Sequence, residues 1–365
     1  MKRLLCILSN MNAGGAETFL MKLYRTLDKT KYQMDFCVNV KERCFYEDEI
    51  IEMGGKIYRI PSKSENAQAF KRQLTELIQK EAYEQVLRIT SNAMGFWDLK
   101  IAKQAGAKRG VARSSNSSDG AGLKQKLAHR LGKLLYRKYV DVCIAPSDLA
   151  ATYTFGKNAI TKGRAHILHN AIDLSLFYFD TEKRASVRRE LGIEEGRLVF
   201  GHIGRFMTQK NHGFLLDVFK TIKEKEPRAL LLLVGKGELQ EQLEQKAKDL
   251  DITDSVIFAG VRSDIPAVLS AMDVFVFPSL YEGMPNTVIE AQATGLPCVI
   301  ADTITKEANI TGLVQYLPLG STEQWAEKAF AAVNLERKDT REDFLKHQYD
   351  IESATKEFVR LCFGE

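Results

Sequence analysis

Several protein classes are excluded by what this sequence lacks. Its six cysteines form no C-x-x-C pair and no zinc-ligand spacing, and most stand inside apolar, strand-like runs, so we expect reduced thiols in the core. No segment approaches the roughly 18 consecutive apolar residues that a membrane-spanning helix needs. The opening segment MKRLLCILSN has only five apolar residues before polar ones, too few for the core of a signal peptide. The sequence therefore predicts a cytoplasmic protein.

A strong excess of one charge is also missing. The chain has 52 Lys and Arg against 47 Asp and Glu, a formal net charge of +5, which is too small for a nucleic-acid-binding protein that relies on bulk charge. No G-x-G-x-x-G motif follows a strand-like run, and the nearest match, GKGEL from residue 235, lacks the third glycine. A nucleic-acid partner and a dinucleotide-dependent oxidoreductase are therefore both disfavoured.

What is present is a chain long and apolar enough for two domains. It has 365 residues, 45% of them hydrophobic, and an ordinary domain has about 150 residues. Short apolar runs alternate with helix-length segments: LLCILS, MDFCVNV, KIYRIP, QVLRIT, DVCIAP, LVFGHIG, ALLLLVG, SVIFAG, DVFVFP and PCVIAD. Such strands are typical of a parallel sheet covered on both faces. We therefore predict an α/β fold with two doubly wound, Rossmann-like domains.

The alternation breaks once, between residues 168 and 197, where a turn, several aromatic residues and a charged helix interrupt it. This break predicts a domain boundary near residue 170. Ligands of open parallel sheets bind outside the carboxyl ends of the strands, so we expect the functional site in a cleft between the two domains.

The first candidate site follows the first strand. Gly14 and Gly15 stand in NAGGAE, directly before a helix. Two glycines there allow backbone N–H groups to approach an anion, and the helix start adds positive potential. A tight strand-to-helix turn with no ligand explains the pair equally well.

A second candidate is GHIGRFMTQKN, which again follows a strand and opens a helix. Gly204 allows close backbone approach, while Arg205 and Lys210 both belong to the strand's carboxyl end. Two fixed cations there favour a dianion, because Arg presents a planar fork to phosphate oxygens and Lys a point charge. Solvated loop cations are the simpler alternative.

The third candidate is YEGMPNTVIE. Its proline and the following asparagine fit a helix start, so Glu282 is expected in the loop before the helix and Glu290 one turn into it. Glu290 would accept hydrogen bonds from ribose hydroxyls and Glu282 from sugar hydroxyls. Two solvated acids near a helix start are the alternative. The backbone N–H groups expected to point at an anion are those of Asn286, Thr287 and Val288.

Taken together, these residues resemble the retaining glycosyltransferases of the GT-B fold, family 4, also known as glycosyl transferases group 1. The resemblance covers nearly the whole chain. It is carried by NAGGAE, HNAID from residue 169, GRFMTQKN from residue 204, GVRSDIP from residue 260, and the E-x7-E spacing of Glu282 and Glu290. Their order and their placement at strand ends make the combination specific.

The resemblance implies a nucleoside diphosphate sugar donor, commonly a UDP-sugar, with no cofactor. It also implies that Arg205 and Lys210 contact the diphosphate, Glu290 the ribose and Glu282 the donor sugar. The segment containing Val261 and Arg262 would lie against the base, and the Gly14-Gly15 loop would close on the donor phosphates. The domains implied are 1–170 on the acceptor side, 171–345 for the nucleotide sugar, and 346–365 as a helix returning to the first domain.

One departure from the family pattern concerns histidine. Many relatives have His in the stretches that read VARSSNSSDG and RITSN in this chain, and neither stretch contains one. We expect Ser115, Asn116 or Asp119 to replace the usual histidine contact to the donor sugar or acceptor.

The residues present favour transfer without a metal ion. Negative charge grows on the departing diphosphate, where Arg205, Lys210 and helix-start N–H groups would stabilise it. The D-x-D of Asp249 and Asp251 follows a helix and precedes a strand, so we interpret it as a turn at the amino end of the sheet. Retention of anomeric configuration is implied by the resemblance alone.

Residues 123–138, LKQKLAHRLGKLLYRK, hold six basic residues and no acid, with leucines on one side of the expected helix. A solvated basic helix of the first domain is one interpretation. Contact with an anionic membrane surface is the other, which would suit an acceptor linked to a lipid carrier.

The sequence thus predicts a hexosyltransferase that moves a sugar from a nucleotide donor to a saccharide or lipid-linked acceptor, in cell-surface polysaccharide or glycolipid synthesis. Two alternatives remain. A nonhydrolysing sugar-nucleotide epimerase on the same fold would release altered sugar nucleotide without an acceptor. A catalytically dead sugar-nucleotide sensor or scaffold would bind UDP without turnover.

Overall fold

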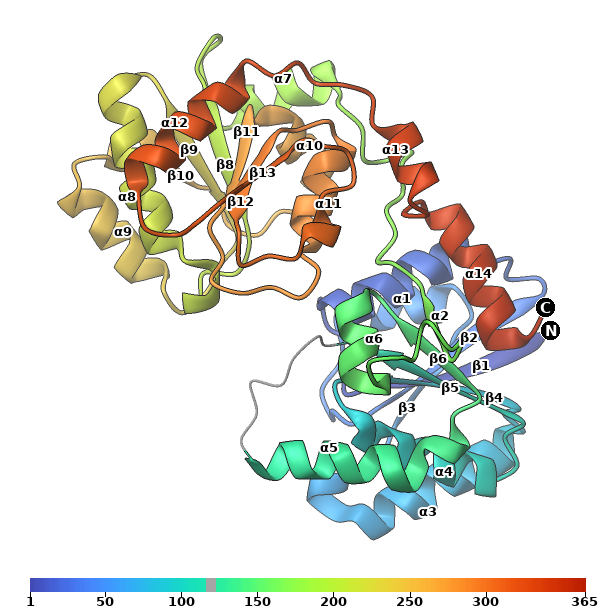
Figure 1. The fold of residues 1–365 in the computed structure, drawn as a ribbon. Coiled ribbons are helices and arrows are strands. Elements are labelled where there is room, and N and C mark those ends of the chain that lie inside the picture. The colour runs from blue at the N-terminus through green and yellow to red at the C-terminus, as the bar shows by residue number, and fades with distance from the viewer. Residues whose placement is uncertain (116–122) are drawn as a thin grey trace. The chain divides into compact units, whose positions relative to one another are not determined.

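The computed structural model describes residues 1–115 and 123–365 and consists of two compact units. Unit 1 comprises residues 1–171 and 348–365, and unit 2 comprises residues 172–347. Unit 1 is drawn in blue and green with a red C-terminal helix, whereas unit 2 runs from yellow-green to red (Figure 1). Within the described ranges, no helix is both long and apolar enough to cross a membrane.

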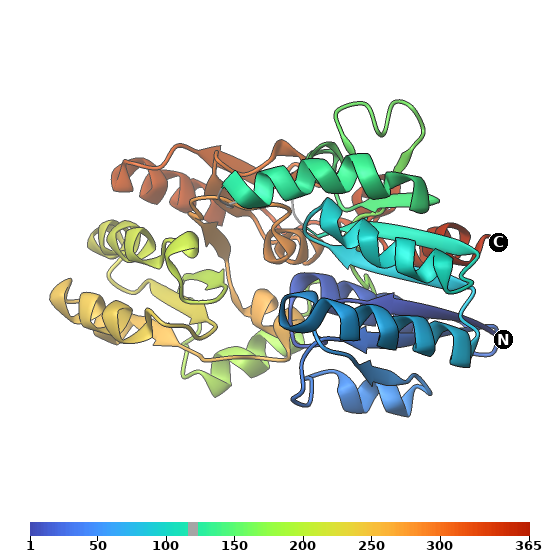
Figure 2. The same ribbon diagram turned by 90° about the horizontal axis from the view of Figure 1, so that it is seen from below.

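Unit 1 is built on a seven-stranded parallel sheet in the order β3-β2-β1-β4-β5-β6-β7. Helices cover both faces of this sheet (Figure 2). Its strands are β1 (Lys2–Ile7), β2 (Tyr32–Val38), β3 (Ile57–Arg59), β4 (Gln85–Thr90), β5 (Arg109–Ser114), β6 (Val142–Ala145) and β7 (Ala165–Ile167). Its helices are α1 (Gly15–Thr26), α2 (Glu47–Glu52), α3 (Lys63–Glu81), α4 (Phe96–Gln104), α5 (Leu123–Tyr136), α6 (Asp148–Phe155) and α14 (Ile351–Phe363).

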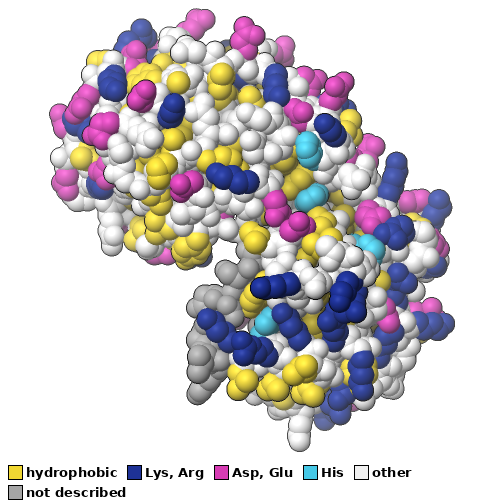
Figure 3. Space-filling view, in the orientation of Figure 1, with side chains coloured by type: hydrophobic (Ala, Val, Ile, Leu, Met, Phe, Trp, Pro, Cys, Tyr) yellow, Lys and Arg dark blue, Asp and Glu magenta, His cyan; other side chains and the backbone are white. Residues whose placement is uncertain are grey.

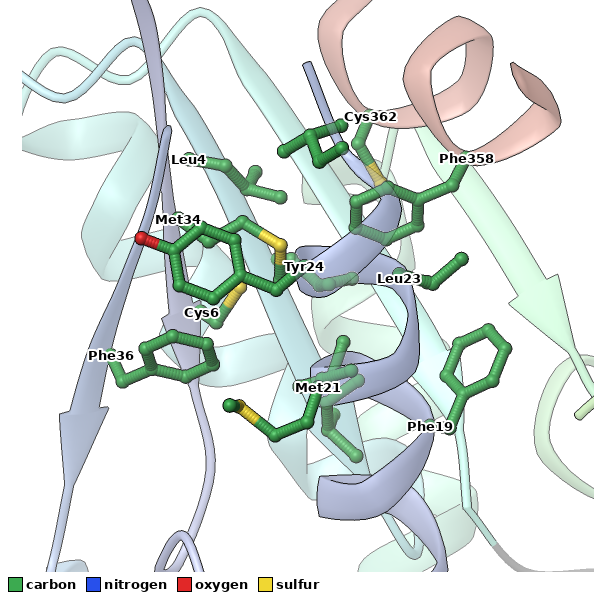
Figure 4. Packing of buried hydrophobic residues seen from close by; sticks show 14 of the residues in the cluster. Leu4, Cys6, Phe19, Met21, Leu23, Tyr24, Met34, Phe36, Phe358 and Cys362 are labelled. Atoms are coloured by element: carbon green, nitrogen blue, oxygen red, sulfur yellow. The ribbon is translucent and has the colours of Figure 1, made fainter. Parts of the chain in front are cut away.

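The apolar periodicity of two helices explains how they cover one face of this sheet. In α1, Phe19, Leu20 and Leu23 recur at helical spacing and are buried. The apolar face of α14, including Phe358 and Cys362, packs into the same cluster (Figure 4). A second cluster, contributed mainly by α3, α4 and α6, covers the opposite face of the sheet. The last helix of the chain is therefore part of the core of unit 1.

Unit 2 has a six-stranded parallel sheet in the order β10-β9-β8-β11-β12-β13. Its strands are β8 (Val199–Ile203), β9 (Leu230–Val234), β10 (Val256–Phe258), β11 (Val274–Phe277), β12 (Cys298–Ala301) and β13 (Val314–Leu317). Its helices are α7 (Thr181–Glu190), α8 (His212–Lys225), α9 (Gln240–Asp249), α10 (Ile265–Ala271), α11 (Asn286–Ala293), α12 (Thr322–Val333) and α13 (Arg341–Lys346). The predicted α/β fold of two Rossmann-like parallel sheets is confirmed.

Both sheets reverse their strand order at one point. In unit 1 the order reverses between β1 and β4, and in unit 2 between β8 and β11. Helices leave the two strands at such a point toward opposite faces, which opens a crevice at their carboxyl ends. These two crevices are where a ligand is expected.

The HNAID segment fixes the end of unit 1. The His169 ring stacks on Tyr349, with centroids 4.0 Å apart, where the chain has just returned from unit 2. Asn170 Oδ1 accepts a 2.7 Å hydrogen bond from the guanidinium of Arg113, a fully buried side chain of β5. The motif therefore ties the departing and returning segments of the chain to the same unit.

Three strands, β5, β7 and β13, were not among the apolar runs predicted from the sequence. Strand β5 reads RGVARS, and its two arginines conceal the strand pattern. Strands β7 and β13 are short edge strands with half-buried polar residues. All six cysteines are buried free thiols, and burial raises the pKa of Cys37 to about 12.

Candidate active site

In unit 2, the segments that follow β8 and β11 are bonded to each other at the point where the strand order reverses. The backbone N–H of Leu280 donates to the carbonyl of Gln209 at 2.8 Å. The side-chain amide of Gln209 donates in turn to the carbonyl of Tyr281 at 2.9 Å. The short helical turn Thr208–Lys210 is thereby held against the loop that carries Glu282.

An ion pair completes this contact. Lys210 Nζ lies 2.7 Å from Glu282 Oε1, and the two side chains keep only 17% and 10% of their exposure. The same ammonium lies 4.7 Å from the centroid of the Phe277 ring, the last residue of β11. The structure thus brings together two residues that the sequence assigned to the diphosphate and to the donor sugar.

Two buried histidines lie beneath Lys210. His202 Nδ1 lies 2.9 Å from the carbonyl of Val276, so the ring donates there and its Nε2 keeps a lone pair. The His202 and His212 rings are 4.4 Å apart, and within the described residues neither nitrogen of His212 has a hydrogen-bond partner. Burial lowers the pKa of both rings, that of His212 to about 4. Both histidines are therefore neutral near pH 7.

Close backbone approach makes glycine necessary in the neighbouring loop. Gly235, after β9, has φ +140°, and a Cβ there would collide with the carbonyl of Gly204. A Cβ at Gly204 would itself stand 3.1 Å from His202 Nε2 and 3.4 Å from Lys210 Cε. Gly204 therefore has little room for a side chain, because His202, Lys210 and the backbone of Gly235 all lie close to it.

Arg205 pairs with a different acid from Lys210. Its guanidinium is largely exposed and lies 3.3 Å from Glu238, which belongs to the loop after β9. The sequence did not single out Glu238, although the G-x-G at residues 235–237 marked that loop as one of close backbone approach.

Helix α11 begins where the sequence predicts it. Pro285 is the N-cap, Asn286 the first helical residue, and Glu290 is half-buried one turn further on. Thr287 stands in the first turn, while the Val288 N–H already donates to the Pro285 carbonyl at 3.0 Å. Beyond the helix, Gly295 has φ +68°. The Val288 N–H, one of the three that the sequence assigned to an anion, is therefore already used within the helix.

The loop after β10 carries the remaining residues of this region. Gly260 has φ +67° and Val261 is exposed. Arg262 donates two hydrogen bonds to Asp264, at 2.8 and 2.7 Å, and also pairs with Glu190 of α7. These carboxylates raise the pKa of Arg262, so its guanidinium serves mainly to fix the loop.

In unit 1, a pocket of about 320 Å³ lies at the corresponding reversal of strand order, after β1 and β4. Gly14 is the N-cap of α1 and Gly15 its first residue. Glu17, in the first turn, lines the pocket, and burial raises the pKa of its carboxyl. The other lining residues are Leu8, Ser9, Ala16, Lys63, Arg88, Ile89, Thr90, Ser91, Asn92, Met94, Gly95 and Ser115.

Two basic side chains in this pocket share one buried acid. Lys63 Nζ lies 2.7 Å from Asp98 Oδ1, and Arg88 Nε lies 2.6 Å from Asp98 Oδ2. The Arg88 guanidinium also donates to the carbonyls of Ile7 and Ile89, at 2.9 and 2.7 Å. Asp98 therefore neutralises one of the two cations, and Glu17 places a further acid in the same pocket.

The residues expected to replace the family's histidine are only partly placed. Ser115 lines the pocket of unit 1, and its N–H donates to the carbonyl of Thr90 at 2.9 Å. Asn116 and Asp119 lie outside the described residues. Asp249 ends α9 and Asp251, with φ +54°, follows it, so the predicted turn before β10 is confirmed. Among the residues that the structure describes, no group of three or more His, Cys, Asp or Glu could hold a metal ion.

Comparison with known proteins agrees with this geometry. Residues 13–176 match the family described as Glycosyltransferase Family 4, and residues 197–334 match Glycosyl transferases group 1. EpsF of Bacillus subtilis (strain 168), named as a glycosyltransferase, is 36% identical over 363 residues, 96% of this chain and 94% of EpsF. This chain belongs to the same glycosyltransferase family.

One further relative matches only part of the sequence, and one solved structure matches the fold. A UDP-Gal:alpha-D-GlcNAc-diphosphoundecaprenol alpha-1,3-galactosyltransferase of Escherichia coli is 37% identical over 139 residues, 37% of this chain and 36% of that enzyme. The crystal structure of Anabaena Alr3699/HepE in complex with UDP superimposes with a TM-score of 0.79 at 16% identity, covering 100% of both chains. That likeness shows that the two chains share the GT-B fold.

Proposed function

We propose that this glycosyltransferase moves a hexose from a UDP-sugar to a saccharide or lipid-linked acceptor, with retention of configuration, in the synthesis of a cell-surface polysaccharide or glycolipid. The observation that carries the proposal is the Lys210–Glu282 pair where the strand order of unit 2 reverses. A half-buried cation and carboxylate there suit a ligand that has both phosphates and sugar hydroxyls.

In this proposal the acidic and basic side chains contact different parts of the donor. Lys210 and Arg205 bind the diphosphate, Glu290 accepts hydrogen bonds from the ribose hydroxyls, and Glu282 from those of the sugar. The first N–H groups of α11 add fixed partial positive charge near the phosphates. The loop of Val261 and Arg262 flanks the base.

The chemical step follows from these charges. As the glycosidic bond breaks, negative charge increases on the departing UDP, and positive charge develops on the sugar ring. Lys210 stabilises the departing diphosphate more strongly than the bound donor, so it lowers the barrier rather than only the Michaelis constant. With these cations in place, the proposed transfer needs no metal ion.

Support for the substrate classes comes from the relatives. The Escherichia coli enzyme is named for a UDP-galactose donor and a diphosphoundecaprenol-linked acceptor. The HepE structures contain UDP or UDP-glucose. For the acceptor we propose the pocket of unit 1, where Thr90, Ser91 and Asn92 supply hydrogen-bonding groups in place of histidine.

The test is UDP binding followed by a transfer assay. Saturating UDP or the correct UDP-sugar should raise the melting temperature, since ligand at 100 times its Kd adds about 2.7 kcal/mol of stability. Lys210→Ala should reduce the shift that UDP causes, whereas Lys248→Ala, an exposed lysine of α9, should leave it unchanged. Release of an altered sugar nucleotide without acceptor would identify an epimerase instead, and UDP binding without turnover a sensor.

A further inference from the structure

Helix α5 of unit 1 carries a row of leucines that its own unit leaves uncovered. Four of them, Leu127, Leu131, Leu134 and Leu135, are 60%, 44%, 81% and 53% exposed. Single exposed leucines are common on soluble proteins, but four on one helix form a contiguous apolar strip. We call these four residues the leucine strip.

The opposite side of the helix is the one that packs on unit 1. His129 Nδ1 accepts a 3.0 Å hydrogen bond from the Ala93 N–H, and its Nε2 lies 3.0 Å from the Tyr153 carbonyl. A Cβ at Gly132 would stand 2.5 Å from the carbonyl of Ala93. With about 100° of rotation per residue, His129 and Gly132 lie roughly opposite Leu127, Leu131 and Leu134. The strip therefore points directly away from the unit that holds the helix.

Basic side chains lie beside this strip. Lys126 and Arg130, both exposed, precede and follow Leu127 on one flank, and the exposed Lys138 lies in the short turn after the helix. In Figure 3, yellow side chains over α5, near the bottom of the view, adjoin several dark-blue ones. The sequence from residue 123 to residue 138 contains no acid.

We propose that α5 docks on a membrane surface that contains anionic phospholipid, lying in the plane of the interface with the leucine strip inserted among the acyl chains. An apolar strip flanked by Lys and Arg matches both layers that such a helix meets, acyl chains and phosphates. A second copy of the chain fits less well, because pairing two α5 helices around a two-fold axis would place like charges together.

This proposal does not depend on the transfer reaction, so its test uses the whole protein without any donor. The protein should bind to vesicles of phosphatidylcholine with phosphatidylglycerol and sediment with them. It should bind far less to vesicles of phosphatidylcholine alone. Added salt should weaken the binding, because screening shortens the range of the attraction from Lys126 and Arg130.

Two sets of variants separate insertion from charge. Replacing Leu127, Leu131 and Leu134 by Ser should reduce vesicle affinity by about tenfold or more per leucine. The double change Lys126→Ser and Arg130→Ser should reduce it by about 25-fold, roughly fivefold per charge. Matched controls in unit 2 are the triple Ser variant of the exposed Leu176, Leu335 and Leu345, and the double change Lys248→Ser and Lys328→Ser.

The proposal requires that both α5 variants lose binding while both controls keep it. Loss with the basic variant alone would overturn insertion, because adsorption would then be electrostatic. If the leucine variant instead converts a dimer to a monomer in sedimentation velocity, and the unaltered protein ignores vesicles, the strip is an interface between copies and the proposal is wrong.

Discussion

Lys210 donates a 2.7 Å hydrogen bond to Glu282 although 72 positions separate them in the sequence. Each group is thus the counter-charge of the other before any ligand arrives. If the diphosphate binds to Lys210, the ammonium must divide its hydrogen bonds between a carboxylate and phosphate oxygens. Donor binding and the ion pair are therefore expected to compete.

The first prediction follows from this competition. Glu282→Gln should bind UDP as tightly as the unaltered protein or a few-fold tighter, because the Lys210 ammonium then no longer shares its hydrogen bonds with a carboxylate. Its affinity for the intact UDP-sugar should fall, because the proposed sugar contact is lost. Calorimetric titration with both ligands measures the difference. Glu238→Gln, next to the exposed Arg205, is the control and should affect both ligands alike.

A second prediction separates the chemical step from ground-state binding. Lys210→Ala should lower kcat by about 10 to 150-fold, the loss of a charge-assisted hydrogen bond of roughly 1.5 to 3 kcal/mol in the transition state. Glu290→Gln should mainly raise the donor KM, because the ribose contact is the same before and during transfer. Steady-state kinetics of both variants tests this. Equal effects of the two changes on kcat would contradict the assigned roles.

The third prediction concerns metal ions. Transfer should continue in excess EDTA, because the cations at the site are side chains. The assay compares rates with EDTA alone and with added Mg²⁺ or Mn²⁺. Activity that disappears with EDTA and returns with either ion would disprove the proposed metal-free step.

The fourth prediction is a loss of stability in mild acid. Burial lowers the pKa of His202 and His212 in the folded protein, that of His212 to about 4, while an unfolded histidine titrates near 6.5. Stability is therefore complete above about pH 6.5 and falls as the pH drops toward 4, because the unfolded chain binds the protons. The expected slope is about 1.4 kcal/mol per pH unit for each histidine. Urea unfolding at several pH values measures it.

The variant His212→Phe provides the check on this slope. The His212 ring lies against aromatic neighbours, Phe206 and His202, so a phenyl ring suits the site. The slope of the unfolding free energy against pH should then fall by about 1.4 kcal/mol per pH unit, the contribution of one histidine. An unchanged slope would show that other groups cause the acid sensitivity.

A fifth prediction tests the close approach of two loops. Gly235→Ala should lower the free energy of unfolding by more than about 1 kcal/mol and weaken UDP binding, since its Cβ would collide with the Gly204 carbonyl. The control is Gly320→Ala, because Gly320 has φ +143°, close to the +140° of Gly235, but open space around the added carbon. It bears the conformational cost without the collision, so the difference between the variants measures the collision alone.

Much of the fold was predictable because buried parallel strands stand out in the sequence as short, continuous apolar runs. Strand β9, LLLLV, is buried throughout, and its short length and the glycine that follows it favour a buried strand over a buried helix. Strand β5 was missed because Arg113 looks like a surface residue. It is buried because Phe19 stacks on it at 3.9 Å and Asn170 accepts its hydrogen bond, two contacts that come from distant parts of the chain.

The candidate site shows the same limit. Its individual residues stand out in the sequence because they follow strands, and helix α11 begins where the Pro-Asn pair indicates. Their partners do not stand out. Arg205 lies beside Glu238 and Lys210 beside Glu282 because neighbouring loops meet at the sheet edge. Pairing of this kind depends on side-chain directions, which strand order alone does not specify.

The position of α14 has a consequence for biosynthesis. Phe358 and Cys362 complete the core over α1, yet residues 172–347 separate them from the rest of unit 1. On the ribosome, at about 5–20 residues per second, all of unit 2 emerges while the apolar face of α1 is still uncovered. We therefore expect the nascent chain to finish folding its second unit before its first, and to depend on a chaperone to shield that face during the interval.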